Sequence, residues 1–137
     1  MHRYYPMRLM PGLWEFLGHL FSKGKIRSHI IVFDEIVPKR GRKDGLAIWL
    51  SGFKEHFLSA TQKQMELIPG ILNSFPKLID PASEKDQADP WLIALLLELM
   101  EEKGLFGDDS IYVMVTTESE RRSTKLPAAC KFYEIYH

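Results

Sequence analysis

Apolar residues recur every three or four positions over several stretches of the chain, and this spacing predicts amphipathic helices. The first stretch covers residues 11–23 and is bounded by Pro11-Gly12 and by Gly24. Asp44 and Thr61 each precede another apolar stretch and are suitable N-cap residues. Pro69-Gly70 is expected to kink or end the helix that Thr61 begins. A final short helix is predicted within residues 127–136.

The strongest helical pattern covers residues 88–103. Asp89 is predicted to be its N-cap and Pro90 its first helical residue, because both residue types are favoured there. Gly104 stands where a left-handed C-terminal cap is expected. Apolar residues surround the first half of this helix, so that half is expected to be buried on several sides.

Two other segments bear on the fold class. Residues 28–37 contain enough Ile and Val for a strand, but Ser28 is a suitable N-cap, and we predict a short helix. Residues 56–59 are expected to form a brief strand. Residues 111–116 are continuously apolar, which is typical of a strand inside a parallel sheet. A buried helix followed by a buried strand predicts an α/β fold.

Length and composition bear on the number of domains, the possible partners and the location of the protein. A chain of 137 residues with 45% hydrophobic residues fits one domain, residues 1–137. Its 18 basic and 18 acidic residues balance, so no overall field favours nucleic acid or anionic lipid. No apolar run is long enough to span a membrane and no signal peptide is recognised, so a cytoplasmic location is expected. The single cysteine, Cys130, is expected to be a buried, inert thiol.

Carboxylates occur at the ends or edges of several apolar segments. Glu35 follows Asp34 within residues 30–37, Asp89 begins the strongest helix, and Thr117-Glu118 ends the predicted strand. Ligand sites of α/β proteins lie at the carboxyl ends of parallel strands, so these groups could converge there. Helix capping alone would also explain Asp89. Asp86 lies one helical turn before Asp89 and could share the site or remain a solvated acid.

Three sequence blocks in this order resemble those of the PIN-domain nucleases. The blocks are VFDEI at residues 32–36, DPWLIA at 89–94 and VTTE at 115–118. An uncharacterised PIN-like branch is more similar still, through RYYP at 3–6, PGLWEFL at 11–17 and KLPAAC at 125–130. The resemblance covers most of the chain. It implies a PIN-like three-layer α/β/α fold, helix-rich, with a short parallel sheet.

The resemblance also implies a function and a site. PIN-domain enzymes cleave RNA with carboxylates that hold Mg²⁺ or Mn²⁺, and many are toxins paired with an antitoxin protein. By position, Glu35, Asp89, Thr117 and Glu118 correspond to the catalytic group. Glu35, Asp89 and Glu118, with Asp86, would hold the metal. Hard divalent cations prefer oxygen ligands, which agrees with this set.

One family feature has no counterpart here. The family's first acid ends an N-terminal strand upstream of the segment that resembles RYYP, whereas only residues 1–3 precede Tyr4. The expected sheet therefore lacks its first strand, and weak or absent nuclease activity is expected. The chain is either a truncated copy or a non-catalytic protein, unless a second subunit completes the sheet. The alternative function is a non-catalytic PIN-like interaction protein that forms a homodimer.

Several other residues have both a functional and a structural explanation. The basic loop PKRGRK, residues 38–43, could contact phosphates or could simply be solvated, and Arg121, Arg122 and Lys125 form a second basic run. The histidines His19, His29 and His56 lack metal-ligand spacing and are expected to be half-buried or exposed. The three tryptophans, Trp14, Trp49 and Trp91, are expected to be core residues.

Overall fold

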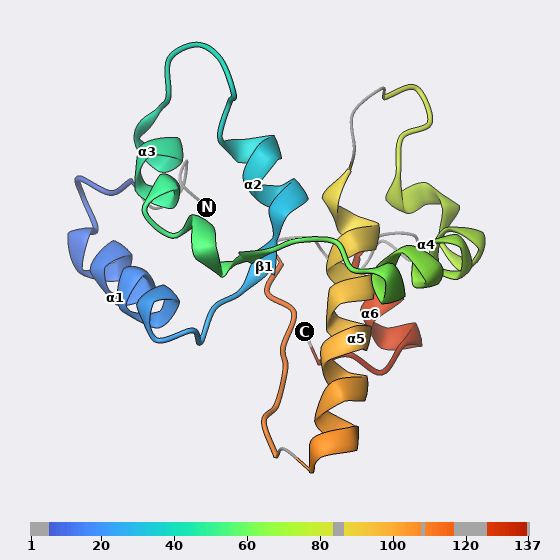
Figure 1. Ribbon diagram of the computed structural model, residues 1–137. Helices are drawn as coiled ribbons and strands as arrows, with labels where there is room; N and C mark the ends of the chain where they lie inside the picture. The colour runs from blue at the N-terminus through green and yellow to red at the C-terminus, as the bar shows by residue number, and fades with distance from the viewer. Residues whose placement is uncertain (1–5, 84–86, 108, 117–125, 137) are drawn as a thin grey trace. The chain divides into compact units, whose positions relative to one another are not determined.

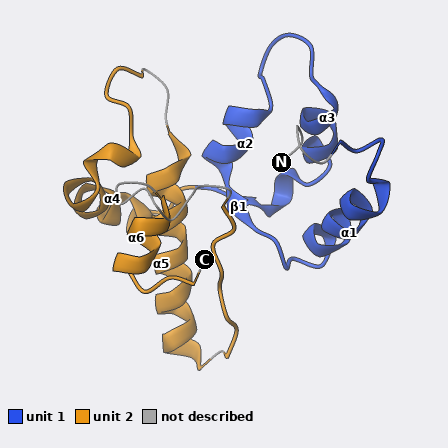
Figure 2. Cartoon of the chain, turned by 180° about the vertical axis from the view of Figure 1, so that it is seen from behind, with its two compact units in different colours: residues 1–59 blue, residues 60–137 orange. Residues whose placement is uncertain are grey.

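The computed structural model describes residues 6–83, 87–107, 109–116 and 126–136 (Figure 1). The chain divides into two compact units, residues 1–59 and residues 60–137 (Figure 2). Each unit is described by itself below. Within the described ranges, no helix is both long enough and apolar enough to cross a membrane.

The first unit combines three helices with two very short strands. Its elements are α1 (Pro11–Ser22), β1 (Ser28–His29), α2 (Ile30–Ile36), α3 (Gly45–Ser51), the 3₁₀ helix η1 (Lys54–His56) and β2 (Phe57–Leu58). The two strands pair in parallel, with Ser28 opposite Phe57 and His29 opposite Leu58. Because parallel neighbours require a crossover connection, α2 and α3 lie between them in the chain.

Aromatic rings form the core of the first unit. Phe21 stacks on Phe57 with 6.0 Å between ring centroids, and Phe33 meets Phe57 edge-on at 5.1 Å. Trp14 is buried and contacts Trp49 edge-on at 5.0 Å. Rings from α1, α2, α3 and β2 thus join these elements, and such pairs add about 0.5–1.5 kcal/mol each beyond burial.

The second unit is helical. Its elements are α4 (Gln62–Ser74), the 3₁₀ helix η2 (Pro76–Leu78), α5 (Ala88–Phe106) and α6 (Leu126–Phe132). Ile93 and Ala94 of α5 are fully buried, and α5 packs against both α4 and α6. Ile71 and Cys130, from α4 and α6, belong to the same hydrophobic core.

The predicted fold class is confirmed at the coarse level. The structure is helix-rich and contains a short parallel sheet, as expected for a small α/β fold. Two predicted caps are also confirmed: the Ala47 N–H donates to Asp44 Oδ1 at 2.8 Å, and the Gln64 N–H donates to Thr61 Oγ1 at 3.1 Å. The helix predicted from residue 11 is α1, the short strand predicted at residues 56–59 is β2, and the last predicted helix is α6.

The prediction for residues 28–37 was wrong at its beginning. Ser28 lies in β1, and His29 is the N-cap of α2, where its Nδ1 accepts a hydrogen bond from the Ile31 N–H at 3.2 Å. His29 is also fully buried, not half-exposed as predicted. The strand and the helix share this residue, so one hydrophobic run contains both elements.

The caps at both ends of α5 differ from the prediction, although the helix begins at residue 88 as expected. The helix begins at Ala88 with Gln87 as its N-cap, so Asp89 lies in the first turn and is not the N-cap. The helix runs through Gly104 to Phe106, and Gly107 forms the left-handed cap with φ of 64°. Packing of α5 on α4 and α6 outweighs the modest cost of one glycine inside a helix.

The helix α4 continues through Pro69, so the expectation that Pro69-Gly70 could end it was wrong. Pro69 removes one helical hydrogen bond. The next turn carries Ile71, which is only 1% exposed in the core of the second unit. Burial of this turn explains why the helix persists beyond the proline.

Residues 111–116 form no regular strand in the part of the chain that the structure describes. They are extended, and an isolated parallel bridge joins Val113 to Tyr136, where the Met114 N–H donates to the Tyr136 carbonyl at 2.7 Å. Met114 is buried, but Val113 and Val115 are exposed. The prediction of a strand buried on both faces is therefore wrong for these residues.

Candidate functional site

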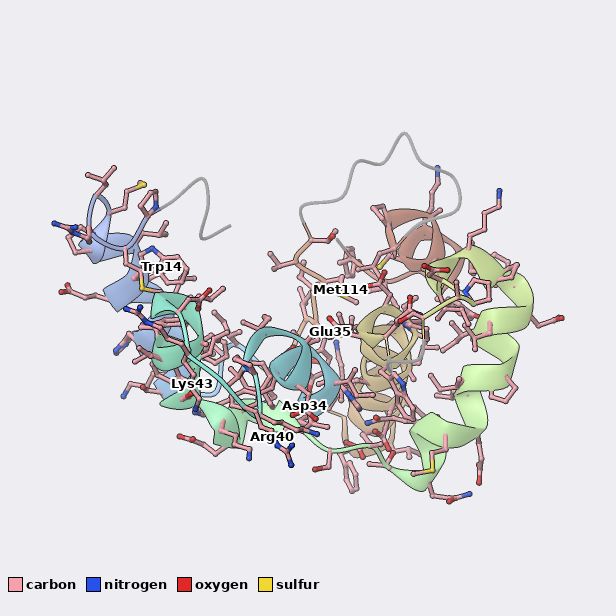
Figure 3. All side chains as sticks on the ribbon, turned by 90° about the horizontal axis from the view of Figure 1, so that it is seen from above. Trp14, Asp34, Glu35, Arg40, Lys43 and Met114 are labelled. Carbon is pink, nitrogen blue, oxygen red and sulfur yellow. The ribbon has the colours of Figure 1, made fainter. Side chains whose placement is uncertain are left out.

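Glu35 lies in the last turn of α2, and its side chain is exposed. The His29 cap fixes where α2 begins, so it also fixes which residues face the core. Phe33 is turned inward and packs on Phe57, whereas Asp34 and Glu35 face outward (Figure 3). Glu35 is thus presented on a short helix whose position is set by a buried histidine and a buried phenylalanine.

The neighbouring Asp34 is paired with a cation. Its Oδ2 lies 3.6 Å from Lys39 Nζ, and both side chains are substantially exposed. An exposed pair of this kind contributes about 0–1 kcal/mol to stability. Asp34 therefore has a local partner in the loop that follows α2, and Glu35 is the acid that the sequence resemblance selects.

Asp89 lies in the first turn of α5, two residues after Gln87, which is hydrogen-bonded to Asp80. The Asp80 N–H donates to Gln87 Oε1 at 2.8 Å, and Gln87 Nε2 donates to the Asp80 carbonyl at 2.9 Å. Ala88 and Pro90 on either side of Asp89 are buried, and Asp89 itself is half-buried. A carboxylate in the first turn interacts favourably with the helix dipole, by about 0.3–1 kcal/mol.

Three members of the predicted site, Asp86, Thr117 and Glu118, lie outside the described residues, as do Arg121, Arg122 and Lys125. Glu35 belongs to the first unit and Asp89 to the second. The predicted convergence of the acids therefore stays a prediction. Over the described ranges, no group of three or more His, Cys, Asp or Glu residues could hold a metal ion.

The donor chemistry of the predicted ligands suits Mg²⁺ or Mn²⁺, because every ligand is a carboxylate oxygen. Two carboxylates among the described residues, Glu35 and Asp89, are exposed or half-buried and would have to be joined by Glu118 or Asp86. The predicted ligands thus fit Mg²⁺ or Mn²⁺ by their type of donor atom.

The sequence analysis did not identify a polar cluster between α4 and α5. Glu98 accepts hydrogen bonds from Thr61 Oγ1 and from Gln64 Nε2, each at 2.6 Å. Gln64 is 1% exposed. One turn after Glu98 on α5, Glu101 Oε2 lies 2.7 Å from the Nζ of Lys63, the residue before Gln64. The Glu101 carboxylate, through its hydrogen bond and its charge, raises the pKa of Lys63.

This cluster has a structural role. Thr61 caps α4 and binds Glu98 with the same hydroxyl, so it ties the beginning of α4 to the middle of α5. No sequence signal points to it, because Gln64 and Glu98 are 34 residues apart and neither belongs to a recognisable motif. The cluster sets how α5, and Asp89 with it, lies against α4.

Cys130 was predicted to be a buried, inert thiol, and the three tryptophans were predicted to be core residues. Cys130 is completely buried, and burial raises the pKa of its thiol from 9.0 to about 11. Such a thiol is neutral at ordinary pH and unsuited to nucleophilic attack. Of the three tryptophans, Trp14 is buried, and Trp49 and Trp91 are half-buried.

One known protein family matches the chain over its whole length. The chain belongs to the family described as "Domain of unknown function (DUF4411)", whose model matches residues 1–137. No curated protein and no solved structure matches the chain.

Proposed function

We propose that this chain is a PIN-like ribonuclease that depends on Mg²⁺ or Mn²⁺ and serves as the toxin of a toxin-antitoxin pair. Glu35, Asp89 and Glu118 would bind the cation, with Asp86 beside Asp89. Thr117 would assist through its hydroxyl. When bound, such a cation activates a water molecule and neutralises charge at the phosphate under attack.

The observation that supports this most is the position of Asp89. Gln87 occupies the N-cap position of α5, and Asp89 lies in the first turn of the helix. It is nevertheless a half-buried acid between the buried Ala88 and Pro90. A carboxylate that is partly removed from water without serving as the cap is a better candidate for metal binding than the capping residue expected from the sequence.

RNA cleavage tests the proposal. Purified protein is incubated with a labelled single-stranded RNA in Mn²⁺, in Mg²⁺ and in EDTA. We expect slow cleavage, in keeping with the weak activity expected from the sequence, that requires the metal and that falls on the order of a hundredfold or more in Asp89→Asn and Glu35→Gln, since each variant removes a charged ligand. Glu102→Gln, an exposed acid near the other end of α5, is the matched control and should cleave normally.

The opposite result is equally informative. Cleavage that persists in EDTA, or that the Asp89 and Glu35 variants retain, would contradict a carboxylate metal site. If no RNA is cleaved and no cation binds, the nuclease proposal fails.

A second candidate function is supported by a separate observation. Ile111, Val113 and Val115 alternate along one extended segment and are 70%, 54% and 89% exposed. Exposed β-branched residues in this pattern favour pairing with another chain. A non-catalytic PIN-like interaction protein, self-associating as a homodimer, would use this face. Val113→Lys with Val115→Lys should then convert dimer to monomer in sedimentation experiments, without metal dependence.

A further inference from the structure

The two compact units have opposite net charges, although the whole chain is neutral. Residues 1–59 contain ten Lys and Arg against five Asp and Glu, which gives +5. Residues 60–137 contain eight Lys and Arg against thirteen Asp and Glu, which gives −5. The zero total thus conceals a basic first unit, and such asymmetry between halves is typical of proteins that bind nucleic acid.

The most concentrated positive charge of the first unit lies in the loop between α2 and α3. Its four cations are Lys39, Arg40, Arg42 and Lys43, and every residue from 38 to 45 is exposed. The loop arches away from the ends of both helices (Figure 1). Gly41, with φ of 92°, makes the turn between the two basic pairs, in a conformation that other residues rarely adopt.

The partners of these cations are few and weak. Lys39 is paired with Asp34 at 3.6 Å, and Lys43 Nζ donates to Ser51 Oγ at 3.4 Å. Among the residues that the structure describes, no ion pair involves Arg40 or Arg42. Figure 3 labels Arg40 and Lys43 on this loop, and Asp34 and Glu35 on α2. Four like charges over five positions repel one another, so a bound polyanion would stabilise the loop.

We propose that the basic loop, residues 38–43, binds the phosphate backbone of single-stranded RNA. This inference rests on the proposed function, because it takes RNA as the polyanion. Arginine binds phosphate oxygens through two parallel hydrogen bonds, which suits Arg40 and Arg42. The loop contains no aromatic residue on which a base could stack. It therefore contacts RNA through charge, without preference for sequence.

The loop also adjoins the proposed site in the chain. It begins two residues after α2 ends, and Glu35 lies in the last turn of that helix. The residues that would hold the phosphate backbone, 39–43, thus follow one proposed metal ligand, Glu35, by only a few positions in the chain. The loop would supply affinity, and the carboxylates would supply the chemistry.

The test is a binding titration in EDTA, in which no cleavage occurs. Fluorescence anisotropy of a labelled 20-nucleotide RNA is followed from 50 to 300 mM KCl. For about four phosphate contacts, the slope of log K against log salt should be about −2.8, from about −0.7 per contact. Arg40→Gln with Arg42→Gln should make the slope shallower by about 1.4 and weaken binding at least about tenfold at 50 mM KCl.

A matched double variant separates the loop from net charge. Lys77→Gln with Lys131→Gln removes two exposed cations from the second unit and should bind RNA as the unmodified protein does. Equal losses in both double variants, or no loss in the loop variant, would overturn the proposal. Absence of RNA binding by the unmodified protein, or tighter binding of a polyglutamate of equal charge, would also overturn it. Unchanged circular dichroism and melting temperature show that the loop variant is folded.

The same titration separates this inference from the proposed function. Glu102→Gln lies outside both the loop and the proposed metal site and should bind RNA in EDTA with unchanged affinity. RNA binding without any metal-dependent cleavage would refute the nuclease and preserve the loop. Cleavage with unchanged binding in the loop variant would refute the loop and preserve the nuclease.

Discussion

At the scale of single residues, the structure explains why some side chains are buried and others are not. His29 and Gln64 are polar residues with almost no exposure, and each makes a specific hydrogen bond. Burial of a polar group costs free energy unless such a partner is present. The sequence could not reveal the burial of these two residues, because tertiary packing sets it, although the partner of His29 is only two positions away.

Gln64→Leu should destabilise the protein by about 1–3 kcal/mol, because one Glu98 oxygen loses its hydrogen bond between α4 and α5. The measurement is the free energy of unfolding from urea titration. Gln62→Leu is the matched control on the same helix. Among the residues that the structure describes, the Gln62 side chain bonds to the exposed Glu66 at 3.1 Å, so its loss should cost no more than about 0.5 kcal/mol. Equal effects would show that the buried bond is unimportant.

The thiol of Cys130 predicts a dependence of stability on alkaline pH. Burial raises its pKa in the folded state from 9.0 to about 11, so above pH 9 the unfolded chain loses this proton first. The raised thiol pKa therefore contributes about 2–3 kcal/mol to the free energy of unfolding below pH 9, and this contribution is lost as the pH rises to about 11. Urea titrations at pH 8 and pH 10.5 measure it. In Cys130→Ala this part of the pH dependence should disappear; an unchanged profile would contradict the assignment to the thiol.

At the scale of elements, sequence patterns identified the helices better than their ends. The caps Asp44 and Thr61 were predicted correctly, since Asp and Thr have a local mechanism for binding the first free N–H groups. The N-cap of α5 was misassigned by two residues and its C-terminal cap by three. Two glycines, Gly104 and Gly107, are both suitable caps, and only packing decides between them.

A pair of substitutions tests the observed end of α5. Gly107→Ala should destabilise the protein by about 1 kcal/mol, because alanine is strained at φ of 64°. Gly104→Ala should stabilise it by about 0.5–1 kcal/mol, since Gly104 lies inside the helix and a Cβ there meets no atom within 4 Å. Thermal unfolding measures both variants. The reverse order of effects would mean that the helix ends at Gly104.

The short parallel pairing could be anticipated only in part. A strand near residues 56–59 was predicted, but its partner lay inside a run that was assigned to a helix. Ser28 and His29 form only two residues of strand before α2 begins. Such a short strand has no periodicity of its own, and pairing with residues 57–58 determines it.

At the scale of the whole molecule, the neutral total charge conceals two units of opposite net charge. The two units of the chain differ by ten charges, and that difference becomes visible only when the boundary near residue 59 is known. The acids of the candidate site were selected from the sequence by their resemblance to the PIN-domain nucleases. Their convergence depends on long-range structure, which local patterns do not encode.

Glu35 and Asp89 are the two proposed ligands among the described residues. Substitution of either residue should lower the free energy of unfolding only slightly. Asp89→Asn loses a helix-dipole interaction of about 0.3–1 kcal/mol, and Glu35 is exposed. Loss of function in these variants can therefore be separated from loss of structure.

The most direct test of the central claim is isothermal titration of Mn²⁺ into the metal-free protein. The account predicts one site per chain, on the order of tenfold or more weaker in Asp89→Asn and in Glu35→Gln, and unchanged in Glu102→Gln. The absence of saturable Mn²⁺ binding, or equal binding by all four proteins, would contradict the proposal that these carboxylates share one cation.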